Sequence, residues 1–166
     1  AVWEPNASHL VEEGMARRIA SGATLNLRGG GFIIMRADLI KQRPDVVKAW
    51  LQAELDSQQY MANEKNSSEM IGFVRSRIQG FSEQSLRRAL YGKYPANEGG
   101  TSTRLCLPYA FTPEIRKVLD DGVSFLNSNK VINTNKMRDD AVMTEFVDAI
   151  LKERNLKAPI GQVGVR

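Results

Sequence analysis

Hydrophobic positions recur at helical spacing over most of the chain, with polar residues between them. In the segment PDVVKAWLQAELDSQQYMANE, residues 44–64, Val47, Trp50, Leu51 and Leu55 fall on one face. This spacing predicts a long amphipathic helix, and Pro44 suits its first turn. The same period predicts six further helices, over residues 7–20, 37–43, 67–80, 82–92, 112–130 and 139–157.

Residues that commonly begin and end helices flank several of these segments. Ser8, Ser82 and Thr112 stand where an N-cap is expected, because their hydroxyl groups can accept a hydrogen bond from a free amide of the first turn. Gly22 stands where the first helix is expected to end, since glycine favours the left-handed conformation after a helix. These residues therefore predict helix boundaries as well as helices.

Strand patterns are confined to a few short stretches. Leu25 and Leu27 alternate with polar residues, and the run FIIM, residues 32–35, is typical of a strand buried on both faces. A third apolar run, Leu105 to Leu107, lies in a long loop, and the tail after residue 157 reads as extended. Two or three short strands are too few to form a complete sheet for so many helices. We therefore expect that part of the fold lies in another segment.

Composition and charge narrow the functional classes. The 166 residues carry a net charge of +4, but the basic residues are interleaved with acidic ones and aromatic residues are only 7%. A nucleic-acid interface would show a concentrated basic patch or aromatic residues that stack on bases. His9 and Cys106 are the only histidine and cysteine, which excludes an internal disulfide and a usual zinc site. We expect no nucleic-acid partner, no metal and no cofactor, and a buried or half-buried, inert Cys106.

The order of several segments resembles the solute-binding proteins of ABC importers for nitrate, sulfonates and taurine, a fold shared with yeast-type thiamine pyrimidine synthases. The resemblance covers nearly the whole chain and is carried by WEP at 3–5, MRADLIKQRPDVVKAWLQAELDSQQYM at 35–61, FTPEIRKVLDDGVSFLNSNKVI at 111–132 and LKAPIGQV at 156–163. It implies an α/β, periplasmic-binding-protein-like (type II) bilobal fold, with the ligand held in the cleft between the lobes. The chain would be the C-terminal half, a helix-rich fragment with few strands. Residues 1–30 would end the second lobe and form the hinge crossover, and residues 31–166 would return to the first lobe, mostly as helices.

Together with this resemblance, local chemistry identifies candidate ligand-binding residues at two places. These are Trp3, Glu4, Pro5, Asn6, Arg28, Gly29 and Gly30. Glycines allow backbone N–H groups to approach an anion, and an arginine adds charge-assisted hydrogen bonds. Glu4 repels an anion, so it fits either an amine on the solute, as in aminosulfonates, or a cationic side chain that pairs with it. The alternatives are a buried strand-end tryptophan with a solvent-facing glutamate, and a β-bulge beside an exposed Arg28.

The resemblance implies a receptor rather than an enzyme. It would capture a small anionic or zwitterionic solute, such as a sulfonate, taurine or nitrate, in the periplasm or as a cell-surface lipoprotein, and deliver it to an ABC permease. We expect a monomer that meets the membrane only through the permease or through a lipid anchor on the missing N-terminal part. An enzyme of the same fold and a ligand-sensing regulatory domain are the alternatives. A single histidine and a single cysteine count against the synthase, which combines a pyridoxal cofactor with histidine chemistry and a cysteine-rich motif. The arginine pairs at 17–18 and 87–88 are expected on solvated faces.

Overall fold

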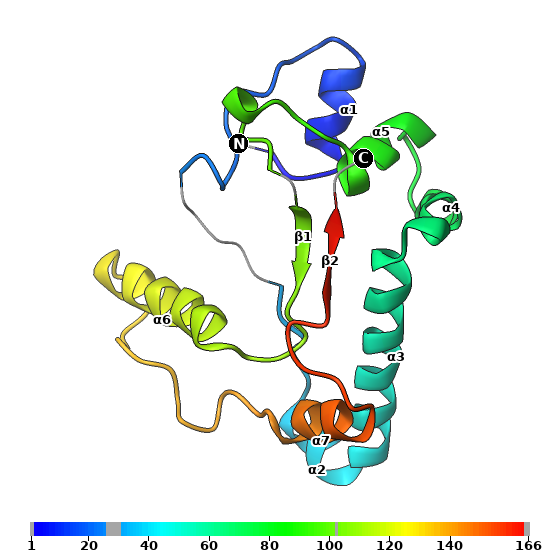
Figure 1. Cartoon of the computed structure of the whole chain (residues 1–166). Coiled ribbons are helices and arrows are strands. Elements are labelled where there is room, and N and C mark those ends of the chain that lie inside the picture. The colour runs from blue at the N-terminus through cyan, green and yellow to red at the C-terminus, as the bar shows by residue number, and fades with distance from the viewer. Residues whose placement is uncertain (1, 26–30, 102, 165–166) are drawn as a thin grey trace. The chain divides into compact units, whose positions relative to one another are not determined.

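The chain folds into a helix-rich α/β structure, as predicted (Figure 1). The structure is a computed structural model that describes residues 2–25, 31–101 and 103–164. Within these residues there are seven α-helices, two 3-10 helices and one two-stranded sheet. In chain order they are α1 (Asn6–Glu12), α2 (Ala37–Gln42), α3 (Pro44–Ala62), η1 (Glu64–Asn66), α4 (Ser67–Arg77), α5 (Glu83–Tyr91), η2 (Ala96–Glu98), β1 (Thr103–Leu107), α6 (Pro113–Ser128), α7 (Glu145–Glu153) and β2 (Gly161–Gly164).

The elements group into two compact units that the chain enters alternately. Unit 1 contains residues 1–27, 57–107 and 161–166, and unit 2 contains residues 28–56 and 108–160. The helix α3 begins in unit 2 and ends in unit 1. The assignment of residues 1–30 and 31–166 to two lobes stays a prediction.

Unit 1 is built around the sheet and the helix α5. The strands β1 and β2 pair in antiparallel register, with Leu105 opposite Val163 and Leu107 opposite Gly161 (Figure 1). The helix α5 packs against α1, α4 and β2. It can do so because its apolar side chains recur at helical spacing and Leu86 is fully buried. The core of this unit therefore joins a helix near the start of the chain to a strand near its end.

Unit 2 contains α2, most of α3, α6 and α7. Its buried apolar side chains are Val47 and Leu55 of α3 and Ile150 and Leu151 of α7. An ion pair of 2.6 Å between Lys48 and Glu153 also connects these two helices. The helix α6 forms where a helix was predicted, but none of its residues is completely buried. The structured core of this unit is thus formed mainly by α3 and α7.

Two predicted caps are confirmed. The Ser82 hydroxyl accepts a hydrogen bond from the Ser85 amide at 3.0 Å, and the Thr112 hydroxyl accepts one from the Ile115 amide at 3.4 Å. The predicted helix at 139–157 is shorter than expected, because α7 begins only at Glu145. The start of α5 and the start of α6 were therefore predicted correctly from their capping residues.

The first helix differs from the prediction at both ends. It begins at Asn6, so Ser8 lies inside the helix and does not cap it. It ends at Glu12 rather than near Gly22, because Gly14 takes a left-handed conformation with φ of 68°. Met15 and Ile19, which a helix over residues 7–20 would place on its apolar face, are 64% and 72% exposed.

The strand predicted at 32–35 is wrong. Residues 31–36 have no regular structure, and Ile34 is 90% exposed. A strand buried on both faces needs neighbouring strands, and in the described part of the chain only β1 and β2 pair. The run at 105–107 does form a strand, β1, and the tail forms β2. Cys106 is exposed rather than buried, because it points to the face of β1 opposite to the buried Leu107. None of the helices over residues 2–25, 31–101 and 103–164 has the length and hydrophobicity needed to cross a bilayer.

Candidate ligand-binding site

The structure places the first group of predicted site residues at the start of α1, in unit 1. Trp3 precedes the helix and is 84% exposed. Pro5 is the N-cap residue, and the exposed Asn6 is the first residue of the helix. The second group, Arg28, Gly29 and Gly30, lies outside the described residues. The candidate site is therefore built from Glu4 and the residues around it.

Glu4 is held by contacts on both carboxylate oxygens. Its Oε2 accepts a hydrogen bond of 3.0 Å from the amide of Ser8, one of the free amides of the first turn of α1. Its Oε1 accepts a hydrogen bond and forms an ion pair with the guanidinium group of Arg18. Of the two partners considered for Glu4, a ligand amine or a cationic side chain, the structure contains the second.

Arg18 is largely buried, so the expectation that it lies on a solvated face is wrong. Its side chain is only 13% exposed. Its guanidinium carbon lies 3.9 Å from the centroid of the Tyr94 ring, at a distance typical of a cation–π contact. The carboxylate of Glu4 and the ring of Tyr94 together offset the loss of hydration of this charge.

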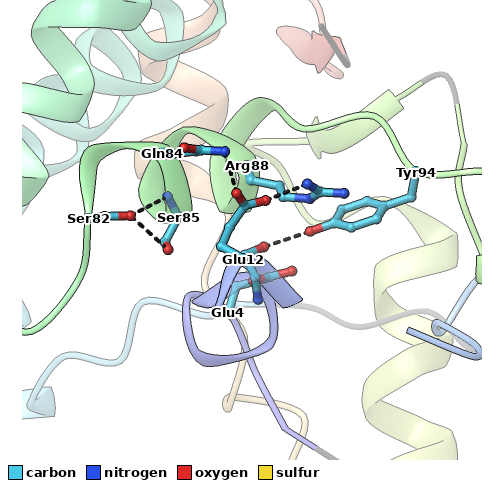
Figure 2. A network of polar contacts seen from close by, with 8 residues as sticks. Glu4, Glu12, Ser82, Gln84, Ser85, Arg88 and Tyr94 are labelled. Atoms are coloured by element: carbon cyan, nitrogen blue, oxygen red, sulfur yellow. Dashed lines mark hydrogen bonds and ion pairs between the residues drawn. The ribbon is translucent and has the colours of Figure 1, made fainter. Parts of the chain in front are cut away.

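Tyr94 links α1 to a second guanidinium group. Its hydroxyl oxygen lies 2.7 Å from the hydroxyl oxygen of Ser8, and Ser8 is completely buried (Figure 2). The guanidinium carbon of Arg88 lies 5.1 Å from the centroid of the same ring. Two cationic side chains from distant parts of the sequence thus approach one aromatic ring.

Arg88 and Glu12 form the other ion pair of this network. The Arg88 guanidinium binds Oε1 of Glu12, and the amide nitrogen of Gln84 donates to Oε2 (Figure 2). Burial alone would lower the pKa of Arg88, but the hydrogen bonds and charges of Glu12 and Tyr94 outweigh it and raise the pKa. Arg88 therefore keeps its positive charge, and the Glu12 contacts connect α1 to α5.

The two arginines retain unused hydrogen-bond donors. Over residues 2–25, 31–101 and 103–164, the Nε atoms of Arg18 and Arg88 are buried and have no hydrogen-bond partner. A guanidinium group presents five N–H donors in a planar arrangement that suits sulfonate, carboxylate or nitrate oxygens. The network therefore combines two paired carboxylates with two cationic groups that each keep one buried Nε–H donor without an acceptor.

The described residues contain no group of three His, Cys, Asp or Glu side chains able to hold a metal ion. His9 lies in the last turn of α1, and its ring packs edge-on against the ring of Phe81, with 5.5 Å between the two ring centroids. The contact that the structure shows for the His9 ring is therefore packing against an aromatic side chain.

Sequence reasoning missed most of the residues that surround Glu4. These are Ser8, Glu12, Arg18, Arg88 and Tyr94. Ser8 was interpreted as a cap, and Arg18 and Arg88 as solvated members of arginine pairs. Tyr94 is separated from Ser8 by 86 positions, and no local pattern predicts such a contact. The one available signal was the negative charge of Glu4, which called for a cation, on the solute or on a side chain, without indicating which one. Searches against protein-family models, curated proteins and solved structures found no match to the chain.

Proposed function

We propose that the chain is part of the solute-binding component of an ABC importer. It captures a small anionic or zwitterionic solute outside the inner membrane and delivers it to the permease, without covalent chemistry. The proposal rests on the segment resemblance described above and on the chemistry around Glu4. The bilobal, periplasmic-binding-protein-like architecture with a ligand between the lobes belongs to the same proposal.

One observation carries most of the argument from chemistry. The buried Nε–H groups of Arg18 and Arg88 have no acceptor among the described residues, and both guanidinium groups approach Tyr94. A buried donor without an acceptor is costly, so an anionic ligand gains affinity there if its binding rearranges these side chains and brings an oxygen acceptor to either Nε–H. The paired carboxylates of Glu4 and Glu12 leave the network near neutrality, which favours a zwitterion such as an aminosulfonate over a multiply charged anion.

The exposed Trp3 is consistent with this proposal. It immediately precedes Glu4, and its indole is 84% exposed. An exposed indole offers a flat apolar surface against which the hydrocarbon part of a small solute can pack. Trp3 would then contact the hydrocarbon part of an aminosulfonate, while Glu4 stays paired with Arg18.

A thermal-shift and calorimetric titration with taurine, methanesulfonate and nitrate tests the proposal. A ligand that binds only the native state at a hundred times its Kd adds about 2.7 kcal/mol of stability, which raises the melting temperature measurably. We expect taurine to give the largest shift. Replacing Arg18→Gln should weaken taurine binding about tenfold or more, because hydrogen bonds to charged groups contribute about 1.5–3 kcal/mol.

Arg17→Gln is the matched control. Arg17 is the neighbouring residue, is exposed, and loses the same single positive charge on substitution. This variant should keep the wild-type affinity for taurine. The proposal is contradicted if none of the three solutes raises the melting temperature, or if the two variants bind taurine equally well.

A further inference from the structure

Unit 1 contains a small apolar pocket between the start of α1 and the helices α4 and α5. Its volume is about 150 Å³. Apart from Glu4, all of its lining residues are apolar. They are Pro5, Val74, Ile78, Leu86, Ala89 and Leu90.

The local structure explains why this pocket is apolar. Leu86, Ala89 and Leu90 are three and four positions apart on α5, so they lie on one face of the helix. The helix α4 ends at Arg77, and Ile78 follows in extended backbone, φ −119° and ψ 137°. Its side chain therefore lines the pocket beside that of Val74, one turn earlier.

The pocket has the size and chemistry of cavities that bind small apolar molecules. An enclosed engineered cavity of about 150 Å³ lined by leucine, isoleucine and phenylalanine stays dry and binds benzene, whereas this pocket has a similar volume but is open to solvent on one side. Water gains little in this pocket, because Glu4 is its single polar lining residue, and both Glu4 oxygens already accept hydrogen bonds from Ser8 and Arg18. An apolar group that fills the pocket would gain both burial and dispersion contacts.

We propose that this pocket is a binding site for a compact apolar group of about six carbon atoms, such as an aromatic ring or a branched alkyl chain. The group is neutral where it enters, since the lining side chains offer an anion no hydrogen-bond donor. This inference does not rest on the proposed capture of a solute by the arginines around Tyr94. Glu4 also lines this pocket, but the contacts proposed here come from the apolar side chains and concern a different ligand chemistry.

Methyl NMR of the full chain, titrated with benzene and with benzoate, tests the proposal. Benzene should shift the methyl signals of Val74, Ile78, Leu86 and Leu90 in a saturable way. Benzoate should bind about tenfold or more weakly, because its carboxylate would lose hydration in a pocket whose lining side chains offer it no hydrogen-bond donor.

Two variants reduce the volume of the pocket. Ala89→Leu adds a larger side chain at a buried lining position, and Val74→Phe adds one at a half-buried position, where the fold tolerates it more easily. Each should weaken benzene binding about tenfold, because the added side chain fills part of the pocket and benzene can enter only if that side chain moves into a less favourable conformation. Ala53→Leu, the same change at an exposed position of α3, is the control and should bind benzene as the wild type does.

The proposal is overturned by any of three results. The first is benzene shifts that do not saturate or that fall on other methyl groups. The second is benzoate binding as strong as benzene binding. The third is wild-type benzene affinity in a folded Ala89→Leu or Val74→Phe variant, with folding checked by the methyl spectrum.

Discussion

The buried contact between Ser8 and Tyr94 offers a direct test of how α1 is held in unit 1. The two hydroxyl oxygens are 2.7 Å apart, and Ser8 and Tyr94 are 0% and 5% exposed. Ser8→Ala and Tyr94→Phe each remove one hydroxyl group and leave the surrounding shape almost unchanged. Each single variant therefore leaves the other hydroxyl buried without this partner.

The expected loss of stability depends on whether one hydroxyl group or both are removed. A buried hydrogen bond contributes about 1 kcal/mol net, and a buried polar group left without its partner costs about 1–3 kcal/mol. We expect each single variant to lose about 1–3 kcal/mol of unfolding free energy. The double variant should lose less than the sum of the two, with a coupling energy of about 1 kcal/mol. Tyr94→Phe also removes the interaction of the phenol with Arg88, and the double-mutant cycle cancels that contribution.

Native-state hydrogen exchange at the amides of α1 and α5 measures these free energies, because it reports on unit 1 without requiring the two units to unfold together. Urea unfolding followed by circular dichroism provides a second measurement of the same four proteins. Additive losses, with a coupling energy below about 0.3 kcal/mol, would refute the claim that these hydroxyl groups bond to each other.

Two further predictions concern single groups. Ser82→Ala should lower the free energy of unfolding, measured in urea, by about 1 kcal/mol, because it removes the acceptor for the Ser85 amide. The control Ser76→Ala, on the exposed face of α4, should change this free energy by less than about 0.5 kcal/mol. Equal losses in the two variants would show that the cap contributes nothing specific. Burial, and then the charges of Glu54 and Asp56, raise the pKa of Tyr109. The unfolded chain therefore loses the phenol proton of Tyr109 at a lower pH than the folded chain does. The free energy of unfolding should consequently fall as the pH rises above about 10. Tyr109→Phe should remove that part of the pH dependence, and unfolding midpoints measured from pH 8 to 11 that fall equally in both proteins would contradict the assignment.

Local patterns predicted that α3 and the starts of α5 and α6 would form, because each pattern carries its own physical cause, but they misplaced the ends of α1 and the start of α7. The long helix α3 was predicted from one apolar face and from Pro44 in its first turn, and both features depend only on neighbouring residues. The caps at Ser82 and Thr112 bond to amides three positions away. Such interactions are encoded within one helical turn, so they can be read from the sequence.

The strand predicted at residues 32–35 failed for the opposite reason. A run of apolar residues indicates burial, but the neighbours that bury a strand come from distant parts of a fold. Phe32 instead stacks on Phe111, with ring centroids 5.9 Å apart, in a segment without regular structure. The strands β1 and β2 form because their pairing partners, separated by more than fifty residues, are both present in the chain.

Glu4 shows how far chemical reasoning alone reaches into the candidate site. Its charge beside an expected anion demanded a cation, and this requirement was correct because Arg18 pairs with it. The requirement did not identify Arg18, because two adjacent arginines at 17 and 18 satisfy it equally in the sequence. What distinguishes them is Tyr94, whose ring lies 3.9 Å from the guanidinium carbon of Arg18 and whose hydroxyl contacts Ser8. The site therefore depends on one aromatic residue far along the chain, which selects the arginine and joins it to the helix that Glu4 begins.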